Sequence, residues 1–127
     1  MESKLKLRIH GNSIRLRLSR SEVELCASQG YLRSSLDFGA MGRFDYSLET
    51  SEDFTFRCAY GSDGILVTVP RNVLNDWASS DRVEISSTIK VSEEATLQLL
   101  VEKDFQCLHK DEVDNSDSFP NPLRVEL

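Results

Sequence analysis

Residues 4–18 read KLKLRIHGNSIRLRL, in which two runs of alternating apolar and charged residues flank Gly11-Asn12-Ser13. Strict alternation is typical of a strand with one buried face, and a Gly/Asn/Ser cluster is typical of a turn. The pattern therefore predicts a β-hairpin. Its Leu and Ile residues lie on one face, and the other face carries the cations Lys4, Lys6, Arg8, Arg15 and Arg17.

A short helix is expected directly after this hairpin. Ser19 and Glu22 have the spacing of a capping box, in which each side chain bonds the backbone N–H of the other residue. Gly30 is a natural helix stop, because glycine readily adopts the left-handed conformation that ends many helices. The sequence therefore predicts a helix between Ser19 and Gly30.

The following residues continue the alternation up to about residue 101. Strands are expected over 32–38, 43–49, 54–60, 65–69, 83–91 and 97–101, and a second short helix over 71–79 after Pro70. Alternation with one buried face is characteristic of antiparallel sheets. We expect a mainly β (α+β) fold of about eight antiparallel strands, arranged as a small barrel or a sandwich with two short helices. No internal repeat is evident.

Length and composition indicate one globular domain. The chain has 127 residues, of which 39% are apolar and 28% charged, and a formal charge of −6. We place the domain at residues 1–108. Residues 109–127 are acidic and contain proline, which predicts an irregular tail that is packed on the domain or partly disordered.

Cellular location is predicted from what the sequence lacks. No apolar run is long enough for a membrane span or a signal peptide, so we expect a cytoplasmic protein without a membrane partner. The three cysteines are widely spaced, which predicts free thiols, with Cys26 and Cys58 as small buried hydrophobic residues. A pI near 4.9 argues against a nucleic-acid partner.

Charge is distributed unevenly along the chain. Residues 1–20 carry six Lys and Arg residues and one acid, whereas residues 93–127 carry nine acids and three basic residues. Cations on adjacent strands can hold carboxylate or phosphate oxygens. We therefore expect the five hairpin cations to contact an anionic partner, such as an acidic protein or the acidic tail of a second copy in a homo-oligomer. The alternatives are a solvated surface and mutual neutralisation of the two ends.

Cys107 and His109 form a second candidate site. On a continuing strand they would face the same side as neighbours at i and i+2. A thiolate and an imidazole suit a transition metal such as Zn, Cu or Fe, and a nearby cation can lower the pKa of a thiol. The alternative hypothesis is therefore a small metal-binding or reactive-thiol protein. The same pair also fits a purely structural role, in which Cys107 is buried and His109 lies on the surface.

A third hypothesis is phosphate-ester chemistry inside a charged barrel. Eight antiparallel strands with charged faces are similar in architecture to the triphosphate tunnel metalloenzymes, but positions 4–6 read Lys-Leu-Lys where that family has paired glutamates. Two short helices cannot cover the apolar faces of eight strands from outside, so we expect those faces to form the core. The sequence also lacks a nucleophile elbow, a P-loop and a dinucleotide-binding turn, which favours a non-enzymatic binding module.

Two segments resemble a family of small uncharacterised bacterial proteins of about this length. One is LRIHGNSIRLRL at 7–18 with SEV at 21–23, and the other is LVEKDFQCL at 100–108 with FPNP at 119–122. The family has no assigned activity. The resemblance therefore implies a stand-alone bacterial domain and transfers no catalytic residue. Members often lack a histidine at the position of His109, which argues against the metal hypothesis.

Overall fold

The structure is a computed structural model that describes residues 5–105 and Phe119. These residues form eight strands, two α-helices and one 3₁₀ turn, η1 (Gly39–Met41). The strands are β1 (Lys6–His10), β2 (Ser13–Leu18), β3 (Tyr31–Asp37), β4 (Arg43–Ser51), β5 (Arg57–Gly61), β6 (Gly64–Pro70), β7 (Glu84–Lys90) and β8 (Thr96–Lys103). The helices are α1 (Arg20–Gln29) and α2 (Arg71–Ser79). The expected mainly β fold with two short helices is confirmed.

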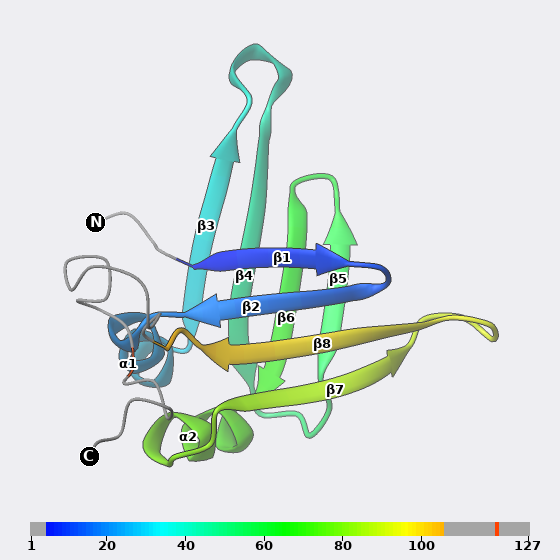
Figure 1. The fold of residues 1–127 in the computed structure, drawn as a ribbon. Coiled ribbons are helices and arrows are strands. Elements are labelled where there is room, and N and C mark those ends of the chain that lie inside the picture. The colour runs from blue at the N-terminus through cyan, green and yellow to red at the C-terminus, as the bar shows by residue number, and fades with distance from the viewer. Residues whose placement is uncertain (1–4, 106–118, 120–127) are drawn as a thin grey trace.

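The strands form two sheets of four, ordered β1-β2-β8-β7 and β3-β4-β6-β5. The strands of one sheet run across those of the other, and both helices lie at one end (Figure 1). Each sheet has two edge strands within the described residues, so the architecture is a sandwich of crossed sheets and not a closed barrel. Of the two expected architectures, the sandwich is the one observed.

The expectation of antiparallel strands holds for the four hairpin pairings and is wrong at the centre of each sheet. There, β2 pairs with β8 and β4 pairs with β6 in parallel. Alternation reports that one face of a strand is buried, and it carries no information on strand direction. Parallel strands are usually covered on both faces. Here each sheet is covered on one face only, by the other sheet, so its parallel strands keep an alternating pattern.

The fold contains a structural repeat that was not evident in the sequence. The segments β1-β2-α1-β3-β4 and β5-β6-α2-β7-β8 have the same order of hairpin, helix and hairpin. Each sheet combines the first hairpin of one repeat with the second hairpin of the other. The strand registers agree as well. Ser13 of β2 lies opposite Gln98 of β8, and their equivalents in the other sheet, Gly64 of β6 and Asp45 of β4, also lie opposite each other. An approximate two-fold relation therefore exchanges the two sheets.

The helices show why the repeat is hidden in the sequence. Cys26 of α1 and Trp77 of α2 occupy equivalent positions and are both fully buried, although their side chains differ greatly in size. Helix α1 begins with the expected capping box, in which the Glu22 carboxylate accepts from the Ser19 backbone N–H at 3.0 Å. Helix α2 begins at Arg71 after Pro70, without a side-chain cap. The repeat preserves burial and element lengths and not residue identity.

The space between the sheets is filled by apolar side chains. The largest fully buried ones are Trp77, Leu16, Leu18, Leu48, Leu74, Ile85 and Leu99. The Tyr46 hydroxyl donates to the Leu5 carbonyl at 2.8 Å, which links one sheet to the edge of the other. The apolar faces thus form the core, as expected. In the described part of the chain the interior is mainly apolar and is not lined by the charged strand faces that phosphate-ester chemistry in a barrel requires.

The predicted domain boundary at residue 108 and the tail at 109–127 lie outside the described residues, except for Phe119. The Phe119 ring packs against the core, with its centroid 5.8 Å from that of Phe105. Its backbone N–H donates to the Asp104 carbonyl at 2.8 Å. Phe119 is therefore a contact between the C-terminal segment and the sandwich.

Candidate anion-binding surface

The cations of the first hairpin lie on the outer face of the sheet, away from the core. Lys6 lies directly opposite Arg17, and Arg8 lies directly opposite Arg15. Lys4 lies outside the described residues. Like charges that face each other across a strand pair are destabilising. We call Lys6, Arg8, Arg15 and Arg17 the basic hairpin face.

Two acids neutralise one end of the basic hairpin face: Glu102, which lies on β8, and Asp104, which follows β8 directly. Arg17 Nη2 lies 2.8 Å from Glu102 Oε1, and Arg15 Nε lies 3.9 Å from the same oxygen. Lys6 Nζ donates to Asp104 Oδ2 at 3.0 Å. Among the described residues, part of the neutralisation that was the alternative thus occurs within one molecule, near the helices.

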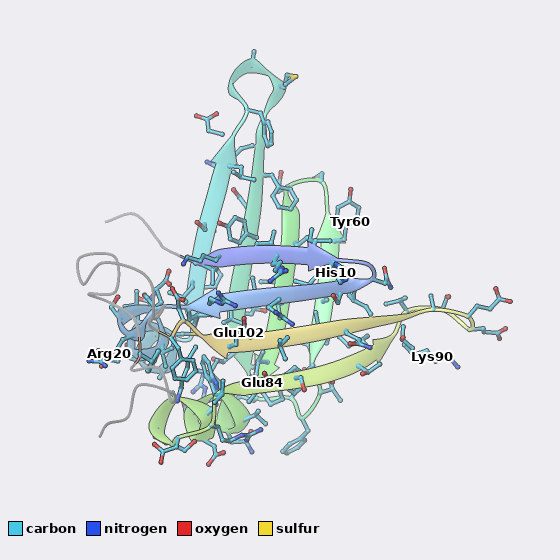
Figure 2. The ribbon with its side chains drawn as sticks, viewed as in Figure 1. His10, Arg20, Tyr60, Glu84, Lys90 and Glu102 are labelled. Atoms are coloured by element: carbon cyan, nitrogen blue, oxygen red, sulfur yellow. The ribbon has the colours of Figure 1, made fainter. Side chains whose placement is uncertain are left out.

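The other end of the basic hairpin face, next to the turn, keeps its positive charge. Arg8, His10, Ser13 and Arg15 line a hollow of about 110 Å³, which we call the turn-end hollow. Among the described residues Arg8 makes no ion pair, and Arg15 has only the long contact with Glu102. Figure 2 shows His10 near the turn at the end of β1, and Glu102 further along the same face. The turn-end hollow is therefore a cationic concavity with little counter-charge.

A larger groove continues from the turn-end hollow across the outer face. It has a volume of about 330 Å³, and Ser13 and Arg15 line both depressions. Its far wall is formed by polar residues of β7, including Glu84, Ser86 and Thr88. An extended ligand in the turn-end hollow can therefore continue across the sheet.

The repeat provides an internal comparison for the basic hairpin face. The hairpin β5–β6 has the register of β1–β2, but Arg8, Arg15 and Arg17 are replaced in it by Ala59, Leu66 and Thr68. The same hairpin thus forms without the three arginines, and Arg57 is the one cation that it keeps, at the equivalent of Lys6. The ladder of like charges is not required by the fold, which favours a binding role over a structural one.

The outer face of the second sheet has its own groove, of about 610 Å³, in which charges of both signs are paired. Hydrogen bonds from Ser35 and the nearby Arg43 and Arg33 lower the pKa of Asp45. Hydrogen bonds from Ser47 and Arg33 lower the pKa of Tyr31. Because these groups satisfy one another, this second groove lacks the excess of positive charge that the basic hairpin face has.

The second predicted site cannot be located, because Cys107 and His109 lie outside the described residues. Residues 5–105 and Phe119 contain no cluster of three His, Cys, Asp or Glu side chains that could hold a metal ion. Burial raises the pKa of Cys26 to about 12 and also raises that of Cys58. Cys26 is buried in the core, as expected for a small hydrophobic residue, whereas Cys58 is only partly buried and packs against the core.

Lys103 is a buried cation whose position the sequence did not indicate. Its side chain is on the inner face, its Nζ donates to the Ser80 carbonyl at 2.8 Å, and Nζ lies 5.7 Å from the Trp77 ring centroid. It lies 5.2 Å from the Phe119 ring centroid. Desolvation lowers the pKa of Lys103. These contacts hold the end of α2 against β8, so Lys103 has a structural role.

Comparison with known proteins identifies the family of this chain. The model of the family of unknown function DUF7009 matches residues 5–123. The chain belongs to DUF7009. No curated protein and no solved structure matches it. None of the helices in the described part of this DUF7009 chain is long and apolar enough to cross a bilayer. The family brings no activity with it, so the proposals below rest on the geometry.

Proposed function

We propose that this DUF7009 protein is a non-enzymatic binding module that takes an acidic protein segment on its basic hairpin face. The observation that carries the proposal is the pair of opposed guanidinium groups of Arg8 and Arg15 beside His10, at the end of the face where Arg8 makes no ion pair among the described residues and Arg15 reaches Glu102 only at 3.9 Å. A bound carboxylate would relieve the repulsion between these groups.

The chemistry of the turn-end hollow suits carboxylates. A guanidinium group offers two parallel N–H donors to one carboxylate, and such charge-assisted hydrogen bonds are among the stronger ones. β1 is an edge strand, so an extended acidic segment can lie along it with alternate side chains beside Arg8 and His10. The contact is exposed to solvent, and its affinity should therefore fall as salt is added.

The repeat supplies the variant that tests this function. Arg8→Ala with Arg15→Leu places at each position the residue found at its equivalent in β5 and β6, where the hairpin forms normally. Arg71→Ala with Arg82→Ala makes the same change in net charge at two exposed positions away from the face. The probe is a fluorescent peptide of about ten glutamates, compared with a glutamine peptide of equal length.

Fluorescence anisotropy at low salt should show binding of the glutamate peptide by the natural chain. Affinity should fall about tenfold or more in the Arg8→Ala/Arg15→Leu variant and stay within about twofold in the Arg71→Ala/Arg82→Ala control. Equal losses in both variants would reduce the interaction to net charge. That result, or no binding by the natural chain, would contradict the proposal.

A further inference from the structure

Strand β7 is an edge strand whose outer backbone groups point away from its own sheet. The Lys103 backbone N–H donates to the Val83 carbonyl at 3.1 Å. The backbone N–H and C=O groups of neighbouring strand residues point in opposite directions. Those of Ile85, Ser87 and Ile89 therefore also hydrogen-bond to β8. The N–H and C=O groups of the intervening residues, from Glu84 to Lys90, therefore face outward, where no strand of the described part of the chain pairs with them.

The features that usually protect an edge are missing from β7. Proline, bulges and charges within the strand commonly block edge-to-edge pairing. β7 reads EISSTIK, and its register with β8 runs unbroken from Glu84 to Lys90. Its only charges are one acid at the start and one cation at the end, as Figure 2 shows. Such a strand is suited to pairing with another strand.

The sequence of β7 is complementary to itself. In an antiparallel pairing of two copies centred on Ser87, Glu84 of each copy lies opposite Lys90 of the other. Ile85 then lies opposite Ile89, and Ser86 opposite Thr88. Outward-facing residues pair with outward-facing residues, as the backbone directions require, and opposite charges or hydroxyl groups that face each other stabilise strand pairs.

Two exposed apolar residues and one unfavourable contact fit the same register. Val83 and Val91, which are 42% and 53% exposed, would face each other across the pairing. Within one molecule, Glu84 lies opposite Glu102, a like-charge pair. Neither Glu84 nor Lys90 makes an ion pair among the described residues. Lys90 of a second copy would supply the cation that Glu84 lacks.

The other edge strands fit a second copy less well. Self-pairing of β1 about its centre would place Arg8 against Arg8, and β5 has only five residues. Self-pairing of β3 would place Tyr31 opposite Asp37, without charge complementarity. We propose that β7 pairs antiparallel with β7 of a second copy of this chain, which joins two four-stranded sheets into one continuous sheet of eight strands across a two-fold axis.

Charge exchange tests the proposal and its register together. Glu84→Lys and Lys90→Glu each place like charges opposite each other in a homodimer. The two single variants complement each other when mixed, and the double variant Glu84→Lys/Lys90→Glu is again complementary to itself. Glu24→Lys, on the exposed face of α1, is the control for a change in net charge.

Sedimentation velocity of the full chain over about two decades of concentration gives the result. The natural chain, the Glu24→Lys control and the double variant should form dimers. Each single variant should weaken dimerisation about tenfold or more, and an equimolar mixture of the two should restore it. A natural chain that stays monomeric throughout would overturn the proposal, and a mixture that fails to associate would overturn the register.

Thr88→Pro is a second test that does not depend on charge. The Thr88 N–H points away from β8, so proline there removes a donor to the partner and leaves the hydrogen bonds within the sheet in place. Circular dichroism should show an unchanged fold and sedimentation a monomer. A persistent dimer would exclude β7 as the interface. The dimer is independent of the proposed function: the Lys90→Glu variant, in which dimerisation is weakened and every residue that lines the turn-end hollow and the larger groove is kept, should still bind the glutamate peptide.

Discussion

Arg17 and Glu102 lie opposite each other on β2 and β8, and both Nε and Nη2 of the arginine reach the same carboxylate oxygen, at 3.0 and 2.8 Å. The equivalent pair in the other sheet is Thr68 and Glu49, in which the hydroxyl donates to the carboxylate at 3.2 Å. The two glutamates thus occupy equivalent positions, but within residues 5–105 and Phe119 only Glu102 of the two neutralises a cation. Glu102, together with Asp104 beside Lys6, therefore sets how much positive charge the basic hairpin face retains.

Glu102→Gln should increase the affinity for acidic peptides while it lowers stability. The change removes the counter-charge of Arg15 and Arg17, and we expect the free energy of unfolding to fall by about 1–2 kcal/mol. Affinity for the glutamate peptide should rise several-fold at low salt. Glu49→Gln is the control, because its partner is a neutral hydroxyl. If both variants bind equally, Glu102 does not regulate the face.

Local features of the fold were predictable from the sequence, and the pairing of distant segments was not. The capping box at Ser19 and the turn at Gly11, whose φ is +55°, depend on a few adjacent residues. The contact between Arg17 and Glu102 depends on a parallel pairing of strands from opposite ends of the chain. Alternation cannot encode that pairing, since it specifies faces and not neighbours.

The candidate site was predicted in part for the same reason. The alternation of one hairpin identified Lys6, Arg8, Arg15 and Arg17 together with Lys4, which lies outside the described residues, but the division of the four described cations into a neutralised end and a free end follows from β8. The comparison of Arg8 and Arg15 with Ala59 and Leu66 required knowledge of the repeat. The repeat is not visible in the sequence, because equivalent buried positions hold residues as different as Cys26 and Trp77. Cys107 and His109 lie outside the described residues, so their site stays a prediction.

Gly64→Ala should be strongly destabilising. Gly64 begins β6 with φ of +144°, a conformation that residues with a side chain rarely adopt, and a Cβ there would overlap the Asp45 backbone carbonyl. We expect a loss of about 2–4 kcal/mol in urea unfolding. Gly61→Ala, at the other end of the same turn, meets open space among the described residues and should change stability by less than about 1 kcal/mol. Comparable losses in the two variants would contradict this reading of the turn.

Stability should fall above pH 9 because of Cys26. Burial raises the pKa of this thiol from 9.0 to about 12 in the folded chain, so between these values the unfolded state releases a proton that the folded state keeps. Proton release on unfolding favours the unfolded state as pH rises. The decrease in the free energy of unfolding that is attributable to Cys26 should reach about 1.4 kcal/mol at pH 10. Urea unfolding of the natural chain and of Cys26→Ala at pH 8 and pH 10 measures this contribution, because the stability difference between the two chains should change by that amount between the two pH values. A difference that does not change with pH would mean that the thiol is accessible to water.

Metal analysis decides between the binding module and the alternative at Cys107 and His109. A binding module that acts through the basic hairpin face needs no metal, so untagged protein purified without chelator should contain no stoichiometric transition metal. Cys107→Ser and His109→Ala should then bind the glutamate peptide as the natural chain does. One equivalent of Zn, Fe or Cu that disappears in both variants would instead establish a metal site, because a thiolate and an imidazole are the ligands these ions prefer. In that case the peptide affinity of the metal-free chain would show whether the site and the basic hairpin face act independently.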